Sequence, residues 1–175
     1  MPGKEQPPGI TNQKQQTPVC RQAGKTTNSF TEPQTSNLEL TMLREELQQH
    51  IASRFPDYSI EEGGQFLTVN VPAAQWKNFA HFLRDTKEMQ FDFLFCLTCV
   101  DWLKHLTMVY HLRSYAHKHE LVVKCQLDRE KPEIESVAYT WRTAEFHERE
   151  VFELFGVYFL NHPDLRKLIL PDDWE

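Results

Sequence analysis

Long apolar runs are absent from this chain of 175 residues. The most apolar stretch, residues 91–100, contains Asp92 and is followed by Asp101, whereas a membrane-spanning helix needs about 20 consecutive apolar residues. The N-terminus lacks the apolar core of a secretory signal. We therefore expect a cytoplasmic chain with no membrane span, which can still be part of a membrane complex.

An excess of basic residues is also absent. The formal net charge is −6 and the sequence pI is near 5.8, whereas phosphate-binding proteins carry a basic face or stripe. This balance argues against nucleic acid as a partner. The hydrophobic content of 40% is enough for one domain with a buried core.

Cysteines are few: Cys20, Cys96, Cys99 and Cys125. They are too scattered for a disulfide framework. Cys96 and Cys99 have the spacing of half a zinc site or of a redox pair, and His117 and His119 lie downstream. However, the pair lies in a strand pattern, where residues three apart point to opposite faces. We expect core cysteines and solvated histidines, and a stand-alone zinc or thiol-redox protein remains the alternative from another class.

Motifs that identify a catalytic group are missing. Neither Gly-x-Ser-x-Gly nor His-Glu-x-x-His occurs. The stretch Ala23–Thr27, AGKTT, resembles the end of a phosphate-binding loop, but Val19 occupies the position of the first glycine. We therefore expect no catalytic, cofactor-binding or metal-binding residue on this chain.

Three regions follow from the pattern along the chain. Residues 1–36 are rich in Pro, Gln, Thr and Asn and predict a disordered tail. Residues 37–142 predict an α+β core domain, and residues 143–175 a C-terminal helix with an extended tail that docks on a partner. The fold class that we expect is α+β, with two layers and helices on a mixed, largely antiparallel sheet.

The core elements are predicted from apolar periodicity. A helix begins near Asn37, a strand covers residues 66–71, and Pro72 opens a second helix whose buried stripe includes Trp76 and Phe79. Strands follow at residues 91–100, 107–113 and 121–127, and a hairpin loop joins the last two.

The last helix is predicted from Thr143, as its cap, to Phe155, with Gly156 in the left-handed position that follows. Arg149 lies four residues from both Glu145 and Glu153, which predicts a solvated charge ladder. Glu148 and Glu150 border apolar residues, where a charge normally needs a partner. The helix is apolar on several sides, and either full packing within the domain or sharing with a partner protein accounts for this.

The closing stretch, HEREVFELFGVYFLNHPDLRKLILPDDWE, makes the chain recognisable. It resembles the C-chain, or 30 kDa subunit, of respiratory complex I, NADH-quinone oxidoreductase. The matching positions are Glu148-Arg149-Glu150, Phe152, Gly156-Val157, residues 162–167 and residues 170–175. The chain departs from that pattern at Glu153, where Asp is usual, at Phe146-His147, where Trp is common, and after Glu175, where relatives commonly continue.

This resemblance implies a non-catalytic subunit of the peripheral arm, on the cytoplasmic side of the inner membrane. It implies packing against the D-chain, the 49 kDa-type subunit that lines the quinone site, and against the iron–sulfur subunits. FMN and the iron–sulfur clusters would be carried by neighbouring chains, and NADH and quinone would act at the complex rather than on this chain. The equivalent subunit of a related membrane-bound hydrogenase or ferredoxin-dependent complex is a second possibility.

From the resemblance and the spacing together we expect one set of partner-facing residues. They are Glu148, Arg149, Glu150, Phe152, Phe155, Gly156, His162, Pro163, Asp164, Arg166 and Trp174.

Overall fold

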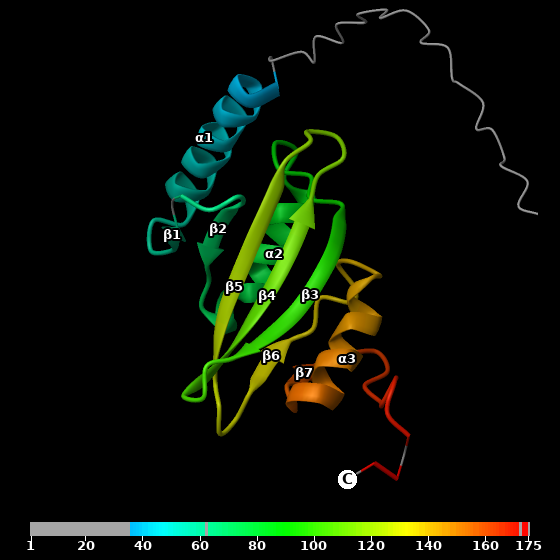
Figure 1. Cartoon of the computed structure of the whole chain (residues 1–175). Helices are drawn as coiled ribbons and strands as arrows, with labels where there is room; N and C mark the ends of the chain where they lie inside the picture. The colour runs from blue at the N-terminus through cyan, green and yellow to red at the C-terminus, as the bar shows by residue number, and fades with distance from the viewer. Residues whose placement is uncertain (1–35, 62, 172, 175) are drawn as a thin grey trace, which may run out of the picture. The chain divides into compact units, whose positions relative to one another are not determined.

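The computed structural model describes residues 36–61, 63–171, 173 and 174, and the side chains of the first helix from Arg44 onward. The predicted tail, the AGKTT stretch and Cys20 lie outside these residues. The described elements begin with a helix, two short strands and a second helix, and a run of three long strands follows (Figure 1). The first helix, α1, covers Ser36–Arg54, one residue earlier than predicted.

A five-stranded sheet forms the centre of the domain. Its spatial order is β1-β2-β5-β4-β3. The strands are β1 Ser59–Glu61, β2 Leu67–Asn70, β3 Phe93–Asp101, β4 His105–Arg113 and β5 Glu120–Asp128. Within this sheet β2 and β5 pair in parallel, and the other neighbours are antiparallel. The mixed, largely antiparallel sheet of the predicted α+β class is therefore confirmed.

Alternation along the strands explains how the sheet buries one face. In β4 the even-numbered residues from Leu106 to Leu112 are buried, while the odd-numbered ones are half-buried. The buried face packs against α2, Trp76–Asp85, which follows a short 3₁₀ turn at Ala73–Gln75. Trp76 is fully buried, and its ring lies 4.2 Å from that of Tyr110, centroid to centroid. The predicted helical stripe and strand alternation are thus both present.

A second sheet was not predicted. It consists of β6, Glu133–Glu135, and β7, Tyr158–Leu160, which pair in parallel. Each strand has three residues, too few to show a period in the sequence. Ile134 and Phe159 are paired neighbours and both are buried in the same core as the large sheet. The second sheet therefore ties the C-terminal part to the domain.

The C-terminal helix, α3, covers Ala144–Phe155 and packs along β3 (Figure 1). Trp141, just before it, donates its indole N–H to the carbonyl of Phe91 at 2.7 Å. Ala144 and Val151 belong to the same apolar core as the strands. No helix among the described residues is long and apolar enough to cross a membrane.

Candidate docking site at the C-terminus

Both ends of α3 are determined by contacts with other parts of the chain or by backbone conformation. Thr143 does not cap the helix with its side chain, contrary to the prediction, because its hydroxyl donates to the carbonyl of Leu94 on β3 at 2.7 Å. Gly156 has φ +72° and its N–H bonds to the carbonyl of Phe152 at 3.0 Å. This left-handed position favours glycine, so the predicted end of the helix is confirmed. From there the chain turns back along α3.

Arg149 holds the returning chain rather than forming a solvated ladder. Its Nε donates to the carbonyl of Arg166 at 3.0 Å and its Nη2 to the carbonyl of Lys167 at 2.9 Å. The residue is only 6% exposed. The predicted ladder is wrong because helical spacing reports only neighbours on the same helix. The two carbonyls are 17 and 18 positions further along the chain.

Glu153, one turn after Arg149, holds the next part of the same segment. Its carboxylate accepts the backbone N–H groups of Leu168, Ile169 and Leu170 at distances from 2.8 to 3.3 Å. Burial alone would raise the pKa of Glu153, but these three donors and the nearby Lys167 lower it below the ordinary value. Residues 161–170, called the C-terminal segment below, are therefore fixed to α3 by a cation and an anion in successive turns.

Glu148 is fully buried, and its carboxylate is bonded inside the chain. Ser136 donates its hydroxyl to Oε2 at 2.6 Å, and the N–H of Val137 donates to Oε1 at 2.8 Å. Burial raises the pKa of Glu148 to about 7, although the two donors act in the opposite direction. The carboxyl of Glu148 thus has hydrogen-bond partners, as expected for a polar group beside apolar residues, and both belong to this chain.

His162, the second residue of the C-terminal segment, points into the domain. Its side chain is fully buried, and its Nε2 lies 3.0 Å from the carbonyl of Glu145 and 3.7 Å from Oε2 of Glu148. Nδ1 accepts the N–H of Asp164 at 3.0 Å, and the Asp164 carboxylate pairs with Arg166 at 2.8 Å. The His-Pro-Asp step is thus a turn that returns the chain to α3.

Large apolar side chains remain exposed along α3 and the segment that it holds. We call these residues the apolar surface: Phe146, Leu154, Phe155, Leu168, Ile169 and Trp174, with exposures from 37% to 62%. The contacts of Arg149 and Glu153 bring the segment against the helix, so Leu154 lies next to the turn that carries Leu168 and Ile169. Exposed apolar side chains of this size are a feature of interaction surfaces.

The expected partner-facing residues fall into three groups. Glu148, Arg149 and the side chain of His162 are buried within the chain. Glu150 and Phe152 are half-buried. The exposed ones are Phe155, Gly156, Pro163, Asp164, Arg166 and Trp174. Contact of any of them with a partner stays a prediction.

Four members of the apolar surface were not among the expected residues. They are Phe146, Leu154, Leu168 and Ile169. Phe146 and Leu154 flank Glu150 on the helix, and that juxtaposition was the signal that could have identified them. Leu168 and Ile169 are held through their backbone N–H groups, and Leu165 packs against the core.

The two cysteines of the zinc or redox alternative lie on opposite faces of β3. Cys96 is half-buried opposite His111 on the open face, whereas Cys99 is buried opposite Met108 in the core. Burial raises the pKa of Cys99 to about 11, so the thiol stays protonated at neutral pH. Across the described ranges no three His, Cys, Asp or Glu residues are grouped to hold a metal ion. His117 and His119 are half-buried, not freely solvated as predicted.

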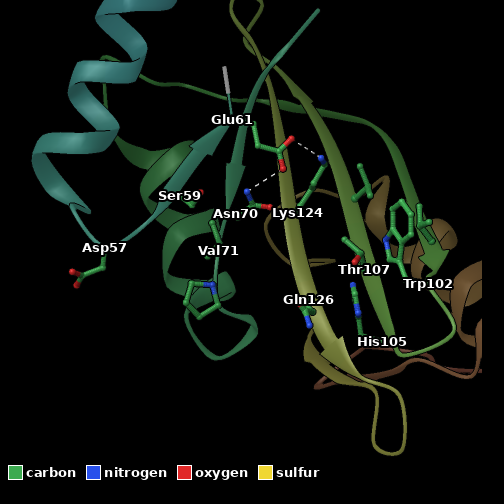
Figure 2. Close-up of a pocket in the computed structure, with 13 residues that line it drawn as sticks. Asp57, Ser59, Glu61, Asn70, Val71, Trp102, His105, Thr107, Lys124 and Gln126 are labelled. Atoms are coloured by element: carbon green, nitrogen blue, oxygen red, sulfur yellow. Dashed lines mark hydrogen bonds and ion pairs between the residues drawn. The ribbon is translucent and has the colours of Figure 1, made fainter. Parts of the chain in front are cut away.

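An open hollow of about 560 Å³ lies on the face of the large sheet opposite to the core (Figure 2). Glu61 accepts from Lys124 at 2.7 Å and from Asn70 at 3.1 Å. The hydrogen bond from Lys124 is the main cause that lowers the pKa of Glu61. Trp102 and His105 border the opposite side. Because the facing charges already pair with each other, we assign no chemistry to this hollow.

The C-terminal arrangement is suited to protein docking. Charged side chains of α3 are used to fix a segment of the same chain, and apolar side chains are left facing outward. The chain is therefore an α+β domain whose C-terminal segment is fixed against its last helix, with apolar side chains exposed on both.

The family model that matches this chain covers residues 69–175 and is described as the respiratory-chain NADH dehydrogenase, 30 Kd subunit. The chain belongs to this family, and the resemblance noted in the sequence is confirmed.

Named relatives support the same assignment. The chain is 43% identical to the C subunit of the NADH-quinone oxidoreductase of Chloroherpeton thalassium over 63% of this chain and 46% of that protein. It is 37% identical to the C subunit of the F(420)H(2) dehydrogenase of Methanosarcina mazei over 71% of this chain and 81% of that protein. It is 43% identical to the C/D subunit of the NADH-quinone oxidoreductase of Bacteroides thetaiotaomicron over 53% of this chain and 20% of that protein. The chain thus spans about half of the length of the first of these relatives and one fifth of the third.

Two solved structures share the fold. One is the trypsin-resistant fragment (1-134) of Nqo5, with a TM-score of 0.60 and 31% identity over 71% of this chain and all of that chain. The other is a chain of the membrane-bound sulfane sulfur reductase, an archaeal respiratory membrane complex. Its TM-score is 0.64, and the identity is 27% over 74% of this chain and 77% of that chain.

Proposed function

We propose that this chain is the C-type subunit of a respiratory NADH-quinone oxidoreductase and that its task is structural. It supports electron transfer from NADH to quinone by packing against the D-type subunit. It lies on the cytoplasmic side of the inner membrane, as a peripheral subunit. The observation that carries this proposal is the apolar surface, held rigidly on α3 by Arg149 and Glu153.

Rigidity is what makes this surface suitable for assembly. An exposed apolar tail without fixed geometry would lose conformational freedom on binding and bind weakly. Here the ordering cost is met within the chain, because Arg149 donates to the carbonyls of residues 166 and 167 and Glu153 accepts the N–H groups of residues 168–170. Partner binding then removes the exposed side chains of Leu154 and Ile169 from water at little further entropic cost.

A D-type subunit is the partner that the relatives favour. In the Bacteroides thetaiotaomicron relative the designation C/D joins the two subunit types in one name. The region similar to this chain covers 20% of that protein, which leaves room for a D-type part in the same polypeptide. Two subunits that one chain can carry in some organisms are expected to contact each other when they are separate.

Catalysis and cofactors belong, in this proposal, to neighbouring chains. FMN and the iron–sulfur clusters are expected on those chains, since cluster ligation needs runs of cysteine thiolates and the two neighbouring cysteines here diverge. NADH and quinone are expected to act elsewhere in the complex.

Two of the similarities favour a second kind of complex. The relative from Methanosarcina mazei is named for F(420)H(2) dehydrogenase and one structural neighbour for a sulfane sulfur reductase. The same subunit type therefore occurs with different electron donors and acceptors, and a ferredoxin-dependent or hydrogenase-type complex is the alternative.

Purification of the tagged chain from native membranes distinguishes the NADH-quinone oxidoreductase from the alternative complex. We expect D-type, flavin-binding and iron–sulfur chains to co-purify in fixed ratios, as quantified by mass spectrometry, with NADH-dependent quinone reduction in the isolated complex. A complex without an NADH-oxidising chain, active with ferredoxin or F420, would favour the alternative. A chain that elutes as a monomer, with none of these proteins, would contradict both.

A further inference from the structure

Among the described residues, no cation lies beside the buried carboxyl of Glu148. Its two hydrogen-bond donors, the hydroxyl of Ser136 and the N–H of Val137, are neutral. Arg149, the next residue, is occupied with the carbonyls of Arg166 and Lys167. Tyr110 of β4 also faces the site, and burial raises the pKa of its phenol, with a smaller contribution from Glu148. An ionised carboxylate here is therefore poorly compensated.

His162 does not supply the missing charge. Its Nδ1 accepts the N–H of Asp164, so the lone pair must be on Nδ1 and the ring proton on Nε2. That proton is directed at the carbonyl of Glu145, 3.0 Å away. A doubly protonated ring would set an N–H on Nδ1 against the N–H of Asp164 and break the turn. The intact turn therefore needs Nδ1 as a hydrogen-bond acceptor.

The imidazole of His162 nevertheless lies against the carboxyl of Glu148. Both side chains have zero exposure, and the distance from Nε2 to Oε2 is 3.7 Å. The other two groups on the carboxyl come from the β6–α3 connection and stay with the domain. The imidazole belongs to the C-terminal segment, so release of the segment removes this cover and exposes Glu148 to solvent.

We propose that docking of the C-terminal segment takes up a proton at Glu148. The segment is held most tightly when this carboxyl is protonated, and it loosens as the pH rises through the acidic range toward neutrality. The coupling is a property of this chain alone. Its consequence, a pH-dependent presentation of the apolar surface to a D-type partner, rests on the function proposed above.

The size and direction of the coupling follow from linkage. In the docked state burial raises the pKa of Glu148 to about 7, whereas in the open state it returns toward the ordinary 4.5. Between these two pH values the docked state holds one proton more than the open state. The docking constant therefore falls by at most about tenfold per pH unit as the pH rises through this window. Above pH 7 it becomes constant.

Amide hydrogen exchange in the isolated full-length chain tests this coupling. Protection factors, corrected for the intrinsic pH dependence of exchange, are followed at Asp164 and at Leu168, Ile169 and Leu170 from pH 5 to 8.5. We expect at least a tenfold fall in protection between pH 5.5 and 7.5 in the wild type. Glu148→Gln mimics the protonated acid and should keep the high protection at every pH.

A matched control uses the other carboxylate of the motif. Glu150 is half-buried and is 3.9 Å from His147, away from the segment, so Glu150→Gln should follow the wild type. Wild-type protection that is flat over this range, or the same slope in Glu148→Gln, would overturn the coupling. A carbon-13 titration of the Glu148 carboxyl decides independently of any variant, and a midpoint at its ordinary value would also overturn it. None of these measurements involves a partner. The coupling can therefore fail without contradicting the proposed function, and the proposed function can fail without contradicting the coupling.

Discussion

Replacing Arg149 by methionine is expected to release the C-terminal segment from α3. The substitution keeps the apolar stem and removes two hydrogen bonds from a charged donor to the carbonyls of Arg166 and Lys167. Hydrogen bonds to charged groups contribute about 1.5–3 kcal/mol each. Allowing for hydration of the freed carbonyls, we expect docking of the segment to weaken by about 3 kcal/mol, or roughly 100-fold.

Limited trypsin digestion measures this effect. Cleavage after Arg166 or Lys167 requires the segment to leave the helix, and its rate follows the open population when opening is fast. We expect cleavage there to be roughly 100-fold faster in Arg149→Met. Arg142→Met is the control, since that side chain is 89% exposed and lies just before the helix. Equal cleavage rates in the two variants would show that Arg149 does not hold the segment.

Unfolding of the wild type is expected to show a contribution from Glu148 that favours acidic pH. A carboxyl with a raised pKa is protonated in the folded state while the unfolded state is ionised. Stability from this group is present below pH 4.5 and is lost as the pH rises to about 7. The shift from 4.5 to about 7 corresponds to about 3 kcal/mol at most.

Urea unfolding of wild type and Glu148→Gln between pH 4.5 and 8 isolates this contribution. Other carboxyls, such as Asp101 and Glu135, have lowered pKa values and contribute with the opposite sign. The relevant quantity is therefore the difference in unfolding free energy between the wild type and Glu148→Gln. We expect the unfolding free energy of Glu148→Gln to rise by about 3 kcal/mol relative to that of the wild type as the pH rises across this range. A difference that does not change with pH would show that folding does not raise the pKa of Glu148.

Local periodicity was enough to predict the core of this domain. The alternation of β4 and β5, the stripe of α2 and the left-handed Gly156 each depend on residues within a few positions of one another. The divergence of Cys96 and Cys99 follows from the same alternation. These features are properties of one element at a time, and the sequence shows them directly.

The site could be predicted only in part because its contacts join distant positions. Arg149 and Glu153 are four residues apart and look like a pair, but each binds backbone groups 15 to 18 residues later. Backbone acceptors and donors leave no trace in side-chain spacing. For Glu148 the pattern showed that a partner was required, but Ser136 and His162 are brought to it by β6 and by the turn after β7.

The central claim is that the apolar surface docks a D-type subunit, and a binding measurement tests it most directly. The double variant Leu154→Asp, Ile169→Asp places charges on two side chains that are 52% and 62% exposed. Leu103→Asp is the control, because Leu103 is 80% exposed on the β3–β4 hairpin. We predict that the double variant keeps the wild-type unfolding free energy and binds the purified D-type subunit at least 100-fold more weakly, while Leu103→Asp binds as the wild type does. Unchanged affinity in the double variant would contradict the account.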